Sequence, residues 1–163
     1  MTRVVCPGSY DPPTNGHLDV FERASRLFEE VVVLVGVNKS KKGLFTVEER
    51  IELLASAVGH LGNVRVDSWY GLTVDYCAEH GVQAIVKGLR TATDFDYELP
   101  MAQMNQQLTG VETLFVPTRP GYSHLSSSLV KEVAAFGGEV VDMLPPEVHK
   151  RLLVRLAEQR DKA

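Results

Sequence analysis

Residues 7–17 read Pro7-Gly8-Ser9-Tyr10-Asp11-Pro12-Pro13-Thr14-Asn15-Gly16-His17, and they are the most informative part of the chain. An apolar run at 4–6 precedes it and predicts a strand, while apolar residues spaced three and four apart follow it and predict an amphipathic helix. The stretch is therefore a strand-to-helix turn, where backbone N–H groups and the helix dipole favour a phosphate. His17 falls in the first helical turn, beside that site. The alternative is an ordinary loop whose histidine caps the helix or packs.

The rest of the chain repeats the alternation of strand and helix. The β-branched runs that predict strands cover 4–6, 31–37, 64–68, 84–86 and 113–116. The segments with helical spacing cover 17–29, 47–57, 74–80, 93–108, 128–136 and 147–159. Such alternation predicts an α/β fold with a parallel sheet covered on both faces, within a single domain over residues 1–163. Ligands of these sheets bind outside the carboxyl ends of the strands, so the loops after the strands are expected to carry the chemistry.

Composition narrows the class of protein. The chain is 44% hydrophobic and 23% charged, as expected for a globular protein, and its net charge of -4 argues against a nucleic-acid-binding surface. No apolar run has membrane-spanning length, and no signal-peptide pattern opens the chain. Cys6 and Cys77 have no metal-binding spacing and are predicted to be buried free thiols. These features indicate a cytoplasmic protein that binds neither nucleic acid nor membrane.

Two of the loops after strands are basic. Lys39, Lys41 and Lys42 follow the second strand and would attract an anion, unless they are a solvated charge run. Lys87-Gly88-Leu89-Arg90 follows the fourth strand. Gly88 would allow the backbone to approach a ligand, and the two cations suit phosphate groups. Glu98, in the next predicted helix, could accept a hydrogen bond from a sugar hydroxyl. The alternative is that these charges form surface ion pairs.

The loop after the fifth strand is rich in serine. Residues 122–128 read Tyr122-Ser123-His124-Leu125-Ser126-Ser127-Ser128. The serines are either helix caps or, with the amides behind them, an anion site, and Tyr122 could stack on a purine. Neither G-x-G-x-x-G nor G-x-x-x-x-G-K-[ST] occurs in the chain. The loops together predict a phosphate-binding edge with no catalytic acid–base pair and no metal cage.

Three blocks carry a resemblance to a known family: Thr14-Asn15-Gly16-His17, the middle block from Lys87 to Leu99, and Ser126 to Glu132. Over about residues 3 to 157, the chain resembles the bacterial phosphopantetheine adenylyltransferases, within the T/H-x-G-H nucleotidyltransferases. This resemblance implies a Rossmann-like, doubly wound, five-stranded parallel sheet of order 3-2-1-4-5 with C-terminal helices. It further implies Mg²⁺ dependence, a homohexamer, feedback inhibition by coenzyme A, and adenylyl transfer from ATP to 4′-phosphopantetheine.

The resemblance also assigns roles to individual residues. His17, Lys41 and Arg90 fall on catalytic positions, and no protein metal ligand is implied. Acceptor contacts fall on Ser9, Lys41, Thr73 and Lys87. ATP contacts fall on Ser9, Tyr10, His17, Gly88, Leu89, Arg90, Glu98, Tyr122, Ser123, His124, Leu125, Ser126, Ser127 and Ser128.

The chain departs from the family at Tyr10, where phenylalanine is usual, and at Pro100, where a residue such as glutamine is usual. Pro100 predicts either a kink in the fourth helix or a later start of that helix. Two other functions fit part of the pattern. One is a sister nucleotidyltransferase that uses nicotinate mononucleotide or glycerol phosphate, and the other is a non-catalytic nucleotide-binding module. The presence of both His17 and Lys41 argues against the second.

Overall fold

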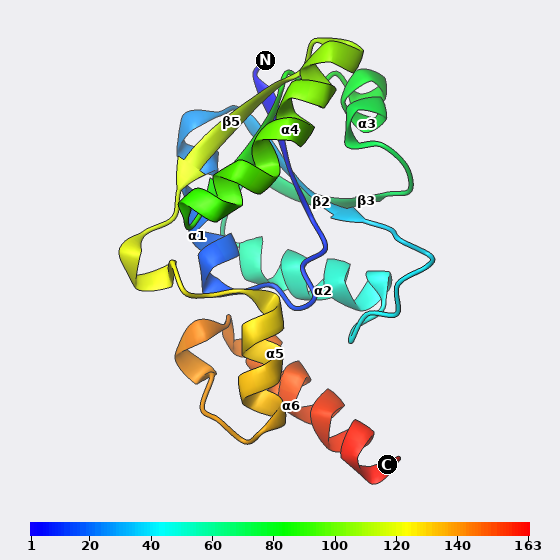
Figure 1. Ribbon diagram of the computed structural model, residues 1–163, viewed down its shortest axis with the longest axis vertical. Helices are drawn as coiled ribbons and strands as arrows, with labels where there is room; N and C mark the ends of the chain where they lie inside the picture. The colour runs from blue at the N-terminus through cyan, green and yellow to red at the C-terminus, as the bar shows by residue number, and fades with distance from the viewer.

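The computed structural model describes residues 1–163, and strands alternate with helices along it (Figure 1). The strands are β1 (Arg3–Gly8), β2 (Glu30–Gly36), β3 (Val64–Trp69), β4 (Ala84–Leu89) and β5 (Glu112–Pro117). The helices are α1 (Asn15–Leu27), α2 (Val47–Val58), α3 (Thr73–His80), α4 (Ala92–Thr109), α5 (Ser127–Ala135) and α6 (Pro146–Asp161), with short 3₁₀ turns η1 (Pro120–Tyr122) and η2 (Val141–Met143). All strand pairs are parallel and the order is β3-β2-β1-β4-β5, which confirms the expected Rossmann-like sheet.

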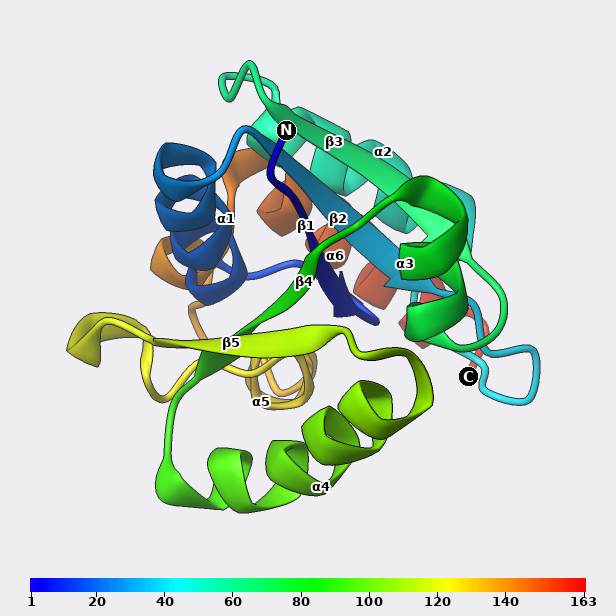
Figure 2. The same ribbon diagram turned by 90° about the horizontal axis from the view of Figure 1, so that it is seen from above.

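The sheet is buried on both faces because the middle of each central strand is a continuous apolar run, as in Val31 to Val35 of β2. Successive strand residues point to opposite faces, so Val4 and Cys6 pack in one cluster with α1 and α2. Val5, between them, packs in a second cluster with Val74 and Tyr76 of α3. Figure 2 shows the result, with α1 and α2 on one side of the sheet and α3 and α4 on the other.

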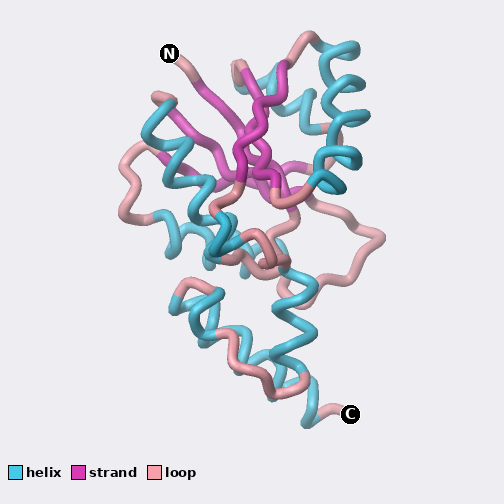
Figure 3. Tube along the Cα trace, turned by 60° about the vertical axis from the view of Figure 1, so that its left-hand side comes forward, coloured by secondary structure: helices cyan, strands magenta, loops and turns pink.

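The C-terminal helices form a third packing unit beside the sheet. Val130 of α5 and Leu152 of α6 are buried in one cluster with Phe45 and Leu53, from the α2 region. Figure 1 shows α5 and α6 at the end of the molecule toward which β1 runs, and Figure 3 shows them below the strands. Their packing places the chain after β5 across the carboxyl ends of the strands. No helix is long and apolar enough to cross a membrane.

The structure corrects three predicted boundaries. β4 continues to Leu89 because Lys87, Gly88 and Leu89 pair with β5, so these residues lie in a strand and not in the loop after it. α4 begins at Ala92 and runs through Pro100, so the predicted later start is wrong. Phe136 is the C-cap of α5 and not a helical residue.

Candidate active site

A cavity opens at the carboxyl ends of β1 and β4, between these strands, the start of α1 and the segment before α5. Eleven of the predicted site residues line it. They are Ser9, Tyr10, His17, Lys87, Gly88, Arg90, Glu98, Tyr122, Leu125, Ser126 and Ser127. These residues come from segments as far apart in the sequence as 9 and 127, and the parallel topology gathers them at one edge.

His17 is held by the helix cap that starts α1. The backbone N–H of Thr14 donates to His17 Nδ1 at 3.0 Å, and the Thr14 hydroxyl accepts from the backbone N–H of His17 at 3.4 Å. Nδ1 is therefore an acceptor, and the neutral ring carries its proton on Nε2. Desolvation, with repulsion from Arg90 and Lys87, lowers the pKa of His17 from 6.5 to about 4. The imidazole is a neutral hydrogen-bond donor at neutral pH.

Tyr10 and Cys6 form the wall behind His17. The Tyr10 ring stands edge-on to the imidazole with their centroids 4.9 Å apart, and its hydroxyl donates to the Cys6 carbonyl at 2.8 Å. Tyr10 adopts a φ of 50°, and its ring covers Gly8 so closely that a Cβ there would lie 2.8 Å from the ring. Burial raises the pKa of the Cys6 thiol to about 12, so Cys6 lies in the cavity wall as a neutral thiol.

The two cations of the cavity are each paired with a carboxylate of α4. Arg90 Nε lies 3.1 Å from an Asp94 oxygen, and its Nη1 donates to the Leu125 carbonyl at 2.9 Å. Lys87 Nζ lies 3.4 Å from Glu98. Ion pairs therefore form, as the alternative interpretation of these charges expected, but their residues line the cavity and are not a surface cluster. A phosphate that entered the cavity would replace these carboxylates as the partner of the two cations, which are already in position.

Two serines at the start of α5 already make hydrogen bonds within the folded chain. Ser126 is the N-cap, since its hydroxyl accepts from the Leu129 backbone N–H at 3.1 Å. Ser127 donates from its hydroxyl to the Pro12 carbonyl at 2.7 Å, which ties α5 to the turn before α1. Gly88 lines the cavity, and it also packs against α1, which is a constraint separate from the ligand approach predicted for it. A Cβ at Gly88 would lie 2.9 Å from Val20 of α1, so packing against α1 requires the glycine.

A second hollow adjoins the first at the ends of β2 and β3, and Ser9 lines both. Its walls include Trp69 and Tyr70, and Lys39 Nζ lies 4.7 Å from the centre of the Tyr70 ring. Lys41 and Thr73 line neither hollow, but each lies within two residues in sequence of a lining residue of the second one. Lys41 is exposed to solvent in the segment that joins β2 to α2.

The remaining predicted residues border the first cavity without lining it: Leu89, Ser123, His124 and Ser128. The sequence reasoning missed Asp94, which holds Arg90 from four residues away. The spacing of an i,i+4 pair at a helix start could have found it. No group of three or more His, Cys, Asp or Glu side chains is placed to hold a metal ion.

The parallel sheet, the histidine at the start of α1 and the two paired cations of the cavity fit a nucleotidyltransferase of the cytidylyltransferase-like class, whose family model matches residues 5–133. Two curated relatives narrow the assignment. The chain is 60% identical to a phosphopantetheine adenylyltransferase of Streptomyces coelicolor, over 96% of this chain and 98% of that protein. It is 59% identical to the phosphopantetheine adenylyltransferase of Frankia casuarinae, over 97% of this chain and 100% of that protein. The chain belongs to the phosphopantetheine adenylyltransferase family.

The depressed pKa of His17 predicts how the ring and the protein respond to acid. An NMR titration of the ring nitrogens should find His17 neutral and protonated at Nε2 from pH 8 to about pH 5. The unfolded chain takes up this proton near pH 6.5 and the folded chain near pH 4, so stability falls as the pH drops through that interval. His17→Gln should lose less stability over the same interval. A ring that titrates near pH 6.5 with both nitrogens protonated contradicts the prediction.

Proposed function

We propose that this chain transfers the adenylyl group of ATP to 4′-phosphopantetheine and releases dephospho-coenzyme A and pyrophosphate. The observation that carries the proposal is the position of His17. Nδ1 accepts from Thr14, so the ring has Nε2–H left as a donor. His17 lines a cavity together with Lys87 and Arg90, and Ser9 lines both this cavity and the second hollow. Two adjoining sites with one shared hydroxyl suit a reaction that joins two phosphorylated substrates.

The chemistry needs no enzyme nucleophile, because the acceptor already carries a phosphate. A phosphate oxygen of the acceptor attacks the α-phosphorus of ATP, the bond from that phosphorus to the bridging oxygen breaks, and pyrophosphate leaves with the electron pair. Catalysis is then positioning and charge stabilisation. His17 Nε2–H donates to a non-bridging α-phosphate oxygen as charge builds there. Lys41 anchors the attacking phosphate, and Arg90 with the start of α5 holds the leaving group.

We extend the proposal to Mg²⁺ as a cofactor. The oxygen donors of the cavity, Asp94 and Glu98, are paired with Arg90 and Lys87, so they suit an ion that arrives with the triphosphate better than one caged by the protein. Phosphate oxygens and water would supply most of its ligands, with these carboxylates nearby. The ion would neutralise phosphate charge. The residues of the chain keep the same roles in orienting the two substrates.

We also propose a cytoplasmic homohexamer with feedback inhibition by coenzyme A. α4 has no buried residue, although Tyr97, Met101, Met104 and Leu108 lie along it and are all exposed. An apolar stripe of this length supports burial against another copy of the chain. Buried free thiols at Cys6 and Cys77 support a reducing compartment. Coenzyme A contains the chemical groups of both substrates, which supports its binding to the same two hollows.

A panel of acceptors tests the proposed reaction. Pyrophosphate release should require ATP together with 4′-phosphopantetheine, with little release from CTP, nicotinate mononucleotide or glycerol phosphate. Dephospho-coenzyme A should appear in equal amount, measured by mass spectrometry. Faster turnover of one of the other acceptors would assign the chain to a sister activity, and ATP binding without any release would make it a nucleotide-binding module.

His17→Ala tests the role of the imidazole. Loss of one donor to a developing charge lowers turnover about 10²–10³-fold, so kcat should fall by at least that factor while ATP affinity stays nearly unchanged. The matched control is His60→Ala, since His60 lies outside the cavity and pairs with Glu22 at 3.1 Å. Full turnover in His17→Ala together with lower thermal stability would make His17 only a helix cap.

Lys41→Ala tests the acceptor site. Loss of a phosphate anchor should raise the KM for the phosphopantetheine acceptor about tenfold or more and the KM for ATP much less. Lys42→Ala removes the same charge from the adjacent exposed position, and should change the acceptor KM by less than about twofold because exposed charges interact weakly. Equal effects of Lys41→Ala on both substrates would contradict the assignment.

A further inference from the structure

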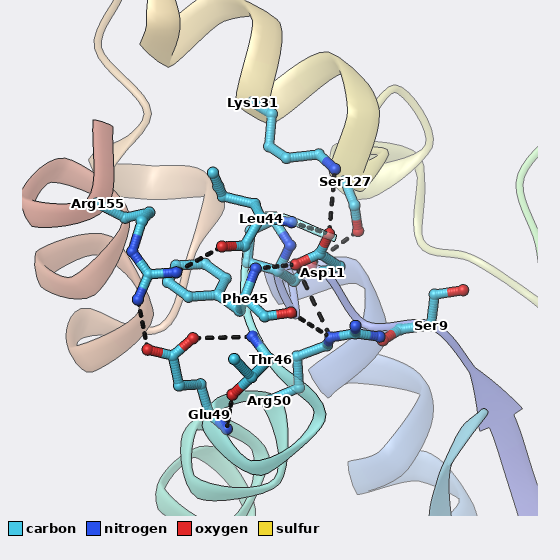
Figure 4. A network of polar contacts seen from close by, with 11 residues as sticks. Ser9, Asp11, Leu44, Phe45, Thr46, Glu49, Arg50, Ser127, Lys131 and Arg155 are labelled. Atoms are coloured by element: carbon cyan, nitrogen blue, oxygen red, sulfur yellow. Dashed lines mark hydrogen bonds and ion pairs between the residues drawn. The ribbon is translucent and has the colours of Figure 1, made fainter. Parts of the chain in front are cut away.

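Asp11 lies within the motif of residues 7–17, yet none of the proposed steps uses it. The residue is only 8% exposed, and both of its carboxylate oxygens accept backbone N–H groups from a distant segment (Figure 4). Oδ1 accepts from Phe45 at 2.8 Å, and Oδ2 accepts from Leu44 at 2.8 Å. A buried carboxylate thus joins the turn before α1 to the segment before α2, across more than 30 residues of sequence.

Two cations complete the surroundings of this carboxylate. Lys131 Nζ of α5 lies 3.4 Å from Oδ2, and Arg50 Nε of α2 lies 3.9 Å from Oδ1. Arg50 also donates to the carbonyls of Ser9 at 3.1 Å and Phe45 at 3.0 Å, so it links the same two segments a second time. The charge of Asp11 is therefore compensated by two cations, and the two segments are joined both by Asp11 and by Arg50.

The segment between β2 and α2 approaches Asp11 too closely for a side chain at position 43. A Cβ on Gly43 would lie 2.9 Å from Asp11 Oδ2 and 2.9 Å from Arg50 Nη2. Gly43 is only two residues after Lys41. The close approach therefore fixes the backbone just beyond the lysine, while the lysine side chain itself stays exposed.

α6 holds the same segment from the other side. Arg155 Nη1 donates to the Leu44 carbonyl at 2.6 Å, and Nη2 bonds Glu49 of α2. Leu44 is thus bound at its N–H by Asp11 and at its carbonyl by Arg155 (Figure 4). α6 lies outside the residues that the family model matches, so the C-terminal helix of this chain adds a contact to the segment that carries Lys41.

We propose that Asp11 is a positioning residue for acceptor binding: it fixes the segment 37–46, and so Lys41, relative to the turn that carries His17. The inference rests on the proposed function, which gives Lys41 the acceptor phosphate. In-line attack needs the attacking phosphate and the α-phosphate held at a defined separation. A lysine on an exposed segment provides that separation only if its backbone is fixed to the histidine-bearing turn, and Asp11 makes that connection.

The test compares two isosteric variants. Asp11→Asn keeps the shape of the side chain and removes its negative charge. Its NH₂ group would face one of the two backbone N–H donors, so one of the two hydrogen bonds is lost. The KM for the phosphopantetheine acceptor should rise about tenfold, with the KM for ATP changed less than about twofold. The matched control is Glu30→Gln at the opposite end of the sheet, where the carboxylate is likewise held by two cations, Arg3 at 2.7 Å and Arg65 at 2.6 Å. That variant should leave both KM values unchanged.

A second readout does not depend on activity. Limited trypsin digestion should cleave after Lys39, Lys41 or Lys42 faster in Asp11→Asn than in the wild type or Glu30→Gln. Gly43→Ala disturbs the contact between Asp11 and the segment 37–46 without removing a charge. If Asp11→Asn does not fold, the same KM and digestion measurements on Gly43→Ala test the inference. The inference would be overturned if Asp11→Asn changed the KM for the acceptor no more than the KM for ATP and trypsin cleaved the variant after residues 39–42 no faster than the wild type. If the wild type does not turn over the phosphopantetheine acceptor, the proposed function fails, while the digestion still shows whether Asp11 fixes the segment.

Discussion

The hydrogen bond from the Thr14 backbone N–H to His17 Nδ1 is the interaction on which the site depends. It satisfies a donor at the helix start that would otherwise need water, and it also fixes which ring nitrogen carries the proton. The hydrogen bond that caps α1 therefore also sets which nitrogen of the imidazole carries the proton. Because Tyr10 packs edge-on to the ring, the imidazole has one orientation and one protonation state before any substrate arrives.

The two cations of the cavity are also held in place by contacts within the folded chain. Arg90 and Lys87 are neutralised by Asp94 and Glu98 of α4, so the free protein does not hold two unpaired positive charges in a partly buried site. In the proposed reaction, the phosphate groups of ATP would take the place of these carboxylates as partners of Arg90 and Lys87. Desolvation is the main cause of the lowered pKa of His17, and repulsion from these two cations adds to it and helps keep the ring neutral.

Local patterns in the sequence predicted the elements of the fold, because strand runs and helical spacing depend on neighbouring residues. The strand order and the roles of single residues came from resemblance, since no local pattern specifies which strands pair. The contacts of Asp11 could not be predicted, because Leu44 and Phe45 take part through their backbones and carry no signal in their side chains. The sequence predicts a loop at Lys87, because the strand partner of this residue, Phe115, lies 28 residues further along the chain and leaves no local signal.

The neutral thiol of Cys6 has a consequence for chemical intervention. A cysteine in the wall of a substrate cavity usually invites covalent inhibitors, but alkylation proceeds through the thiolate. With a pKa of about 12 and almost no exposed surface, this sulfur offers electrophiles a negligible reactive fraction at physiological pH. Acrylamides and similar electrophiles should therefore react slowly with Cys6, which makes this cysteine a poor anchor for covalent compounds aimed at the cavity.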